Sequence, residues 1–212
     1  LIIIIPARSG SKEIKNKNLV KINGKPLILY SFKIAKKIKE KNKVIHCSTD
    51  SNKIKNVSLS YGIDTSFLRP KKISKNHSRD LDFVNYTLKM FFKKGFKFNY
   101  GLILRPTSPV RHEKYINKAY NIFKYNKIFD SMRAIIETNR TPFKMWLKKK
   151  NNIYPLLNSK IKEHYNAPRQ ILPKIYWQTG NFEFFRINFK TNIKSISGNN
   201  IYGFKIKKKI FN

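Results

Sequence analysis

A cluster of cations directly after the first apolar segment is the part of the sequence best suited to chemistry. Residues 6–18 read PARSGSKEIKNKN and include Arg8, Lys12, Lys15 and Lys17. An arginine binds two phosphate oxygens at once through its planar guanidinium, whereas a lysine provides a compact positive charge. Four such side chains on one short segment are suited to binding a triphosphate and to stabilising charge at its α-phosphate.

The small residues between these cations allow the backbone itself to approach an anion. Ser9, Gly10 and Ser11 lack bulky side chains, so their N–H groups can reach phosphate oxygens. The segment matches neither the Walker loop nor the GxGxxG fingerprint, so it indicates neither an ATPase nor a dehydrogenase. A solvated basic turn without a ligand is the structural alternative.

The elements around this segment predict an α/β fold. Short apolar stretches with the character of buried strands occupy residues 2–6, 43–48, 63–68, 99–105 and 129–136. Helices are expected between them, over residues 27–40, 51–60, 80–92 and 113–125. This order predicts a mainly parallel sheet with helices on both faces, whose ligands bind beyond the carboxyl ends of the strands.

The alternation of strands and helices ends near residue 137. The next segments predict a hairpin and then two strands that return to the sheet, at 143–148 with 152–157 and at 181–187 with 200–206. The part between is too short for an independent domain. We therefore interpret residues 1–212 as one domain with an excursion at about 137–178.

The composition admits two readings of a large positive charge. The chain of 212 residues has 46 Lys and Arg against 11 Asp and Glu, a net charge of +35. The first interpretation is a protein that binds a polyanion, such as a nucleic acid or a phosphorylated ligand. The second is codon bias. Codon bias toward A/T explains the surplus of Lys and Asn, but not the shortage of acids. A basic nucleic-acid-binding module is thus an alternative function, but the chain has no helix-turn-helix, zinc or RNA-recognition signature.

The apolar runs and the cysteine content indicate the cellular compartment of the protein. No apolar run approaches the ~18–20 residues of a membrane span, so no membrane association is expected. Cys47 is the one cysteine and cannot form an internal disulfide, which suits the reducing cytoplasm.

Several motifs, in order along the chain, resemble those of one enzyme family. They are IIPARSGSK, KNKNL, INGKPLI, STD at 48–50, LRP at 68–70, LRPTSPVR at 104–111, TPFKMW at 141–146 and YNAPRQ with LP at 165–173. Together they resemble the acylneuraminate cytidylyltransferases, the CMP-N-acetylneuraminic acid synthetases and their relatives. The first loop and the PTSP segment are the most specific of these motifs.

The resemblance implies a Rossmann-like nucleotide-diphospho-sugar transferase fold and a reaction. CMP would pass from CTP to the anomeric hydroxyl of a 2-keto acidic sugar, such as sialic acid or another nonulosonic acid, for surface polysaccharide biosynthesis. Pyrophosphate would leave, and Mg²⁺ would assist. The excursion would pack against a second subunit in a homodimer. A CMP-Kdo-type enzyme or another sugar nucleotidyltransferase is the alternative within this fold.

The resemblance also implies roles for individual residues. The expected catalytic residues are Arg8, Lys12 and Lys17. The expected nucleotide-binding residues are Ala7, Arg8, Ser11, Lys12, Asn18, Arg69 and Ser78. The expected substrate-binding residues are Arg105, Thr107, Ser108, Lys144 and Arg169, with the last two acting across the dimer interface. Either Arg105 or Arg169 could bind the sugar carboxylate bidentately.

The sequence departs from the family pattern at three places. Glu13 stands where relatives usually have glycine, and Arg105 stands where many sialic acid synthetases have glutamine. The Asp-x-Asp metal motif is absent, and we expect it beyond Asn212 in a longer chain; an inactive relative is the alternative. Two other acidic positions, Asp50 and Asp80, could be metal ligands or helix caps, and we interpret both as caps.

Overall fold

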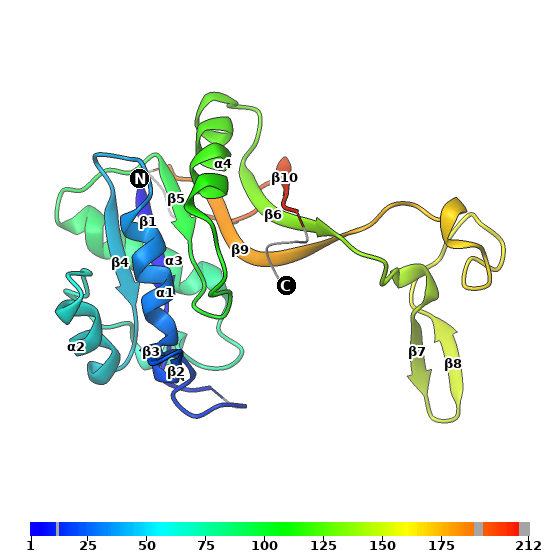
Figure 1. Ribbon diagram of the computed structural model, residues 1–212, viewed down its shortest axis with the longest axis horizontal. Coiled ribbons are helices and arrows are strands. Elements are labelled where there is room, and N and C mark those ends of the chain that lie inside the picture. Colours follow the sequence, from blue (N-terminus) through cyan, green and yellow to red (C-terminus); the bar gives the residue numbers. More distant parts are fainter. Residues whose placement is uncertain (12, 189–192, 208–212) are drawn as a thin grey trace.

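The computed structural model describes residues 1–11, 13–188 and 193–207. Its centre is a six-stranded sheet in the order β10-β6-β9-β5-β1-β4 (Figure 1). The strands are β1 (Ile2–Pro6), β4 (Val44–Ser48), β5 (Tyr100–Ile103), β6 (Ser131–Glu137), β9 (Tyr176–Arg186) and β10 (Ile201–Lys205). Only the pairs that β9 forms with β5 and β6 are antiparallel, which confirms the predicted mainly parallel sheet.

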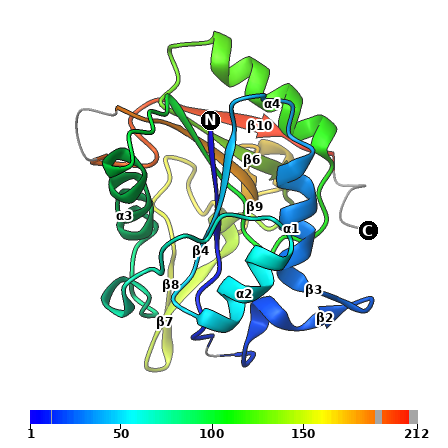
Figure 2. The same cartoon turned by 90° about the vertical axis from the view of Figure 1, so that its left-hand side faces the viewer.

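Helices cover both faces of this sheet, as predicted. They are α1 (Leu27–Lys36), α2 (Asn52–Ser60), α3 (Asp80–Lys93) and α4 (Glu113–Tyr125). The alternating isoleucines of β1 divide the core: Ile3 and Ile5 pack with α1, α2 and α4, whereas Ile2 and Ile4 pack with α3. Figure 2 shows α1 and α3 on opposite sides of the central strands.

The predicted strand at 63–68 is wrong. This segment forms only a single bridge, between Asp64 and His46 of β4. The Asp64 carboxylate is 2.8 Å from the buried His46 ring, and the ring of Phe67 stacks on that imidazole. Beyond this contact the Arg69 N–H donates to the carbonyl of Thr49. These contacts turn the segment away from ladder pairing and carry Arg69 to the carboxyl end of β4.

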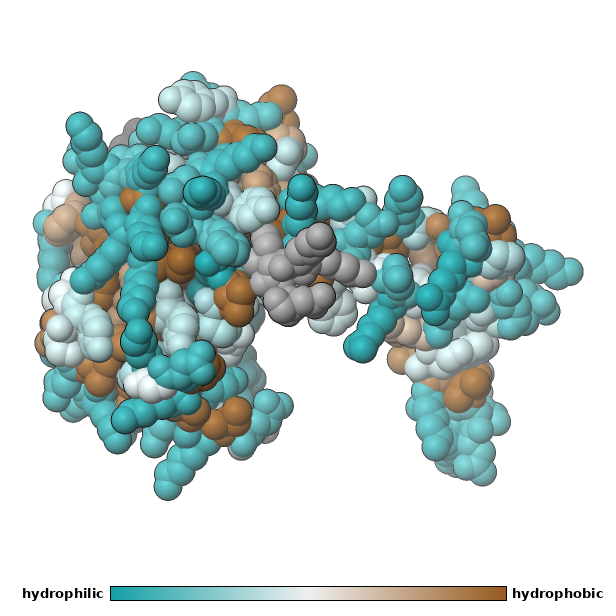
Figure 3. Space-filling model, viewed as in Figure 1, coloured by the Kyte–Doolittle hydropathy of each residue, from teal (hydrophilic) through white to brown (hydrophobic). Residues whose placement is uncertain are grey.

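Residues 138–175, here called the arm, extend away from the sheet between β6 and β9 (Figure 1). The arm contains the predicted hairpin, formed by β7 (Trp146–Lys149) and β8 (Asn152–Pro155). It also contains two 3₁₀ turns, η3 (Pro142–Lys144) and η4 (Arg169–Ile171). Figure 3 shows apolar side chains on its surface, and the residues exposed there include Trp146, Leu147, Ile153, Tyr154 and Ile171.

Three short elements complete the described structure. A small hairpin, β2 (Lys21–Ile22) with β3 (Lys25–Pro26), precedes α1. Two more 3₁₀ turns, η1 (Lys17–Leu19) and η2 (Lys71–Ile73), flank the carboxyl end of β1. No helix in the described part of the chain has both the length and the apolar content needed to cross a bilayer.

Candidate functional site

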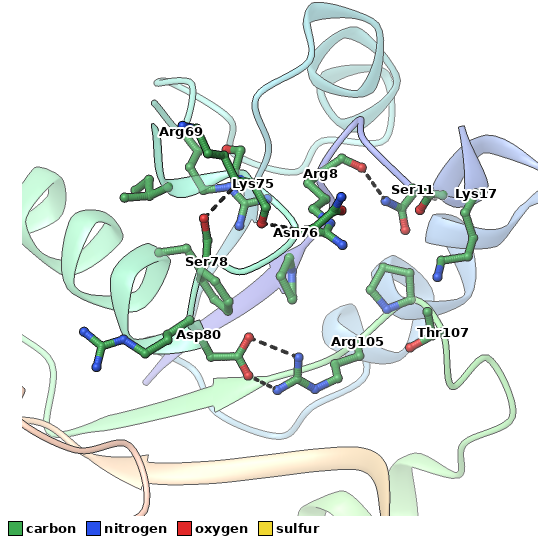
Figure 4. Close-up of a pocket in the computed structure, with 17 residues that line it drawn as sticks. Arg8, Ser11, Lys17, Arg69, Lys75, Asn76, Ser78, Asp80, Arg105 and Thr107 are labelled. Atoms are coloured by element: carbon green, nitrogen blue, oxygen red, sulfur yellow. Dashed lines mark hydrogen bonds and ion pairs between the residues drawn. The ribbon is translucent and has the colours of Figure 1, made fainter. Parts of the chain in front are cut away.

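A cavity of about 320 Å³ lies beyond the carboxyl ends of β1 and β5 (Figure 4). This is the place that a parallel sheet offers to a ligand. Its walls are the loop after β1, the segment 69–80 and the start of the loop after β5. The side chains that matter below are Arg8, Ser11, Lys17, Asn18, Arg69, Lys75, Ser78, Arg79, Asp80, Arg105 and Thr107.

Three hydrogen bonds to neighbouring segments hold the first part of the cationic loop. The Ala7 N–H donates to the carbonyl of Ser48 at 2.9 Å, and Asn18 Nδ2 donates to the carbonyl of Arg8 at 3.0 Å. The carboxylate of Asp50 accepts from the N–H of Ser9. Both Ala7 and Asn18 are buried. The two residues therefore shape the site rather than present charge to a ligand.

The predicted capping role of Asp50 is wrong. The side chain of Ser51, not that of Asp50, accepts the hydrogen bond that caps α2, from the N–H of Ile54. Asp50 instead accepts from Ser9 through both carboxylate oxygens, at 2.7 Å to the N–H and 2.8 Å to the hydroxyl. This side chain thus ties the cationic loop to the end of the neighbouring strand β4.

The cavity is strongly cationic. Six arginine and lysine side chains line it, and Asp80 is the one carboxylate among the described residues that do so. Arg8 reaches across the cavity and donates to the carbonyl of Lys75 at 2.7 Å. Lys12 lies outside the described residues, and Glu13 is exposed. Such a concentration of positive charge in a concave site attracts polyanions.

Arg69 is buried, and two of its guanidinium nitrogens have no hydrogen-bond partner in the described structure. Its exposed fraction is 6%, and within the described structure its Nε and Nη2 atoms have no hydrogen-bond partner. The guanidinium lies 5.3 Å from the centre of the Phe83 ring. Burial lowers the pKa of Arg69. Unsatisfied donors of a buried guanidinium cost free energy, and Arg69 is one of the residues that line the cavity.

Five of the predicted nucleotide-binding residues come together at this cavity with the predicted catalytic Lys17, whereas Ala7 does not line it. Arg8, Ser11, Lys17, Asn18, Arg69 and Ser78 all line it. The hydroxyl of Ser78 accepts from the N–H of Lys75, which closes the turn 75–78 beside the cavity. Sequence reasoning missed Lys75 and Arg79 because the bend that brings segment 69–79 over the loop after β1 is a tertiary feature.

Two of the three predicted substrate residues after β5 also lie at the cavity. Arg105 and Thr107 line it, whereas the hydroxyl of Ser108 is turned to the carbonyl of Thr179 at 3.3 Å. Arg105 is held from two sides, because its Nε donates to Glu183 at 2.7 Å and its Nη atoms donate to the carboxylate of Asp80. The pair of Asp80 and Arg105 faces the cavity in Figure 4.

The predicted capping role of Asp80 is therefore also wrong. Asp80 is the first residue of α3, and its carboxylate binds Arg105. The carboxylate of Asp82 accepts from the N–H of Arg79 at 2.9 Å, and so provides a hydrogen-bond partner for this backbone group at the start of the helix. The two acids lie on different faces of the helix, as their spacing requires.

Arg111 holds the loop after β5 in place through hydrogen bonds of its buried guanidinium. This side chain is 6% exposed and donates to the carbonyls of Asn181 and Arg105 and to the hydroxyl of Ser31. No carboxylate in the described part of the chain pairs with it, and burial together with Arg105 lowers its pKa. Its place in the LRPTSPVR motif was visible in the sequence, but its contacts were not.

The structure does not bring Lys144 and Arg169 to the cavity within one chain. Lys144 belongs to η3 and Arg169 to η4, both on the arm. Arg169 lines a separate hollow of about 270 Å³ at the base of the arm, together with Thr138 and Gln170. Neither residue is among those that line the cationic cavity.

The described residues do not form a divalent-metal site by themselves. In the described part of the chain no three His, Cys, Asp or Glu side chains come together as metal ligands. The carboxylate of Asp80 is already bound to Arg105. Mg²⁺ prefers several oxygen ligands in octahedral geometry, which this arrangement does not supply.

Comparison with known proteins decides the family. The sequence model described as Cytidylyltransferase matches residues 2–166. The chain belongs to this cytidylyltransferase family. It is therefore a nucleotidyltransferase, and the acylneuraminate resemblance is confirmed. A pseudaminic acid cytidylyltransferase of Campylobacter jejuni is 29% identical over 85% of this chain and 76% of the relative.

Two further likenesses extend this result. An N-acylneuraminate cytidylyltransferase of Escherichia coli is 30% identical over 66% of this chain, which corresponds to 32% of that protein. The solved structure of a CMP:2-keto-3-deoxy-manno-octonic acid synthetase complexed with CTP has a TM-score of 0.67 at 14% identity. It covers 97% of this chain and 89% of that structure, and it confirms the predicted nucleotide-diphospho-sugar transferase fold.

Proposed function

We propose that this family member transfers CMP from CTP to the anomeric hydroxyl of a nonulosonic acid and releases pyrophosphate. The observation that carries the proposal is the cationic cavity with the buried, unsatisfied guanidinium of Arg69 at its wall. The relatives named above act, by their names, on pseudaminic acid and on N-acylneuraminate. Both are acidic sugars, so the acceptor class follows from the relatives and the nucleotide from the site.

The loop after β1 binds the triphosphate in this proposal. Arg8 and Lys17 line the cavity and neutralise charge on the phosphate oxygens. The sugar hydroxyl attacks the α-phosphorus and loses its proton to solvent, a new P–O bond forms, and the bond to the departing pyrophosphate breaks in line. Catalysis then consists mostly of positioning and charge neutralisation, with Lys12 as a further cation of the same loop.

Arg69 reads the base in this proposal. Its two free donors can bind neighbouring acceptors on one edge of a ring, and cytosine offers such a pair at O2 and N3. Uracil carries a hydrogen at N3 and would leave one donor unsatisfied. A buried donor without a partner is disfavoured, so Arg69 selects CTP over UTP.

The acceptor sugar lies beside Arg105, Thr107 and Ser108. The first two side chains line the cavity, and Ser108 supports their loop through its bond to Thr179. Mg²⁺ would enter the site with the triphosphate and would neutralise charge on its oxygens. We place the reaction in the cytoplasm, because the one cysteine of the chain is free and buried. A free thiol suits a reducing compartment.

A homodimer completes the site in this proposal. The arm exposes Trp146, Leu147, Ile153 and Tyr154 on a narrow hairpin that has little of its own core to bury them. A gathering of exposed apolar side chains on one element marks an interface. A second copy packed there would cover the hairpin and bring Lys144 and Arg169 to the partner's cavity.

The test is release of pyrophosphate from CTP, with Mg²⁺ and a panel of acids. The panel contains pseudaminic acid, N-acetylneuraminic acid, legionaminic acid and 3-deoxy-manno-octulosonic acid, and so separates nonulosonic from Kdo-type acceptors. We expect turnover with at least one nonulosonic acid, and a loss of at least tenfold in kcat/KM for Arg8→Ala. No release with any nonulosonic acid would count against the proposal, and UTP turned over as well as CTP would remove Arg69 from base selection.

A further inference from the structure

Arg105 is bound by two carboxylates that differ in their access to solvent. Glu183, whose side chain is 4% exposed, lies on the inner side and contacts the Nε atom at 2.7 Å. Asp80, whose side chain is 41% exposed, lies on the cavity side and binds the two Nη atoms. The Arg105 side chain as a whole is 28% exposed. One partner is therefore part of the core, whereas the other lies at the wall of the site.

Glu183, the inner partner, belongs to a buried network of charged side chains. Glu183 also accepts from Arg133, whose Nη2 donates to the hydroxyl of Ser197 at 2.9 Å. Both side chains of this second pair are 10% exposed or less. Removing Glu183 from Arg105 would leave a charge buried without its counter-ion, which is strongly unfavourable. Arg105 is thus fixed in place from behind, and any exchange of partners must occur at Asp80.

We propose that Asp80 occupies, in the free protein, the place that the carboxylate of the acceptor sugar takes on binding. This inference rests on the proposed function. The Nη edge of Arg105 is the bidentate carboxylate site of the cavity, and Asp80 fills it with a carboxylate of the chain itself (Figure 4). The acceptor replaces Asp80 on the guanidinium, and no bond is formed or broken in this step.

The exchange keeps the charges balanced. Arg105 has two carboxylate partners before and after, so the buried pair of Glu183 and Arg133 is undisturbed. The released Asp80 remains the first residue of α3, where the helix N-terminus favours a negative charge. It is also already partly exposed, so little desolvation opposes its release.

This arrangement makes Asp80 a specificity-determining residue. A sugar with a planar carboxylate can replace Asp80, because it offers the same two oxygens to the same two donors. A neutral ester or a neutral sugar offers no negative charge and leaves Asp80 bound. Asp80 thereby raises the concentration at which acidic acceptors bind and excludes uncharged ones.

The test compares Asp80→Asn with the unchanged protein. Asparagine keeps the shape of the side chain but removes the charge that competes for Arg105. We expect the Kd and the KM for the acceptor to fall about three- to tenfold, while the KM for CTP changes less than twofold. The acceptor is the acid of the panel that the unchanged protein turns over fastest, or N-acetylneuraminic acid if it turns over none. Asp80→Ala is the second variant if Asp80→Asn does not fold.

The methyl ester and one matched variant serve as controls. In Asp80→Asn, the Kd of the methyl ester of the same acid should stay above the Kd of the acid itself. Asp82→Asn alters the same helix two residues later, where the carboxylate binds the N–H of Arg79 and does not line the cavity. It should lower the melting temperature without tightening the binding of the acceptor.

The outcomes separate this inference from the proposed function. Turnover of an acid with an unchanged or raised KM in Asp80→Asn overturns the exchange and leaves the proposed function intact. Tighter binding of the acid by Asp80→Asn without turnover by either protein supports the exchange and counts against the proposed function. Absence of acid binding to both proteins overturns the two together.

Discussion

The carboxylate of Asp50 accepts hydrogen bonds from both the backbone N–H and the hydroxyl of Ser9, at 2.7 and 2.8 Å. These two residues follow neighbouring parallel strands, β4 and β1. The contact uses the N–H of Ser9, so this group is not available to a ligand. An acidic residue thus organises a site for an anion without lining the cavity itself.

The first prediction concerns this contact. Asp50→Ala should lower kcat/KM for CTP on the order of tenfold or more, since two hydrogen bonds to a charged group are lost, and Asp50→Asn should retain part of the activity. Steady-state kinetics with varied CTP would measure the effect. Asp130→Ala is the matched control, because Asp130 also accepts two N–H groups, from Asn199 and Asn200, far from the cavity. An equal loss in both variants would contradict the assignment.

The second prediction concerns the buried guanidinium of Arg111. Arg111→Lys keeps the charge but cannot bind the carbonyls of Arg105 and Asn181 together. We expect the KM for the acceptor to rise about tenfold and the protein to lose roughly 2–4 kcal/mol of stability, with a smaller effect on the KM for CTP. Kinetics with each substrate varied, together with denaturant unfolding, would measure both.

Arg186 supplies a control for Arg111. Like Arg111 it makes three hydrogen bonds, here to the backbone carbonyls of Phe123, Asn126 and Phe129, at the opposite end of the sheet. Arg186→Lys should therefore reduce stability while the KM for the acceptor stays within twofold. A similar rise in KM in both variants would show that Arg111 only contributes to stability.

The third prediction concerns the arm. Leu147 is 55% exposed on β7, and Leu147→Glu should convert a dimer to a monomer in sedimentation experiments and lower activity more than tenfold. Tyr125→Ser, which alters a residue that is 80% exposed at the end of α4, should change neither. A dimer that survives Leu147→Glu would exclude the hairpin from the interface.

A mixing experiment tests whether the arm acts on the partner. Arg8→Ala inactivates the cavity of its own chain, whereas Arg169→Ala removes a side chain from the arm. Mixed dimers should regain activity, because one of their two cavities combines an intact loop with an intact arm. No recovery on mixing would place Arg169 outside the partner's site.

The sequence anticipated the elements with regular periodicity. The helix expected over 113–125 coincides with α4, and the strand expected over 2–6 coincides with β1. Both are determined by local apolar patterns. The strand expected over 63–68 failed because Asp64 and Phe67 bind the His46 side chain, a contact between distant residues that no local pattern reveals.

The site shows the same division between local and tertiary features. Motif resemblance identified Arg8, Ser11, Lys17, Asn18, Arg69 and Ser78, and the structure brings them to one cavity. The predicted capping roles of Asp50 and Asp80 were wrong, because a local pattern relates an acid at the start of a helix only to that helix. Both carboxylates bind groups on other elements, Ser9 and Arg105, whose proximity arises from the topology of the sheet.

The fourth prediction concerns pH. Burial lowers the pKa of His46, although the hydrogen bond to Asp64 opposes the shift. The unfolded state therefore takes up a proton first as the pH falls below about 6.5, and stability decreases from there toward the lower pKa of the folded state. The melting temperature should fall between pH 7 and pH 5, and less so in His46→Gln. His112→Gln, at an exposed histidine, should keep the full dependence.

The central claim is that the loop after β1 binds the phosphates of CTP. A crystal structure of the protein with CTP tests it most directly. We predict the triphosphate against Arg8, Ser11 and Lys17, with the cytosine ring beside the guanidinium of Arg69. A triphosphate bound elsewhere, with this cavity left to solvent, would contradict the account.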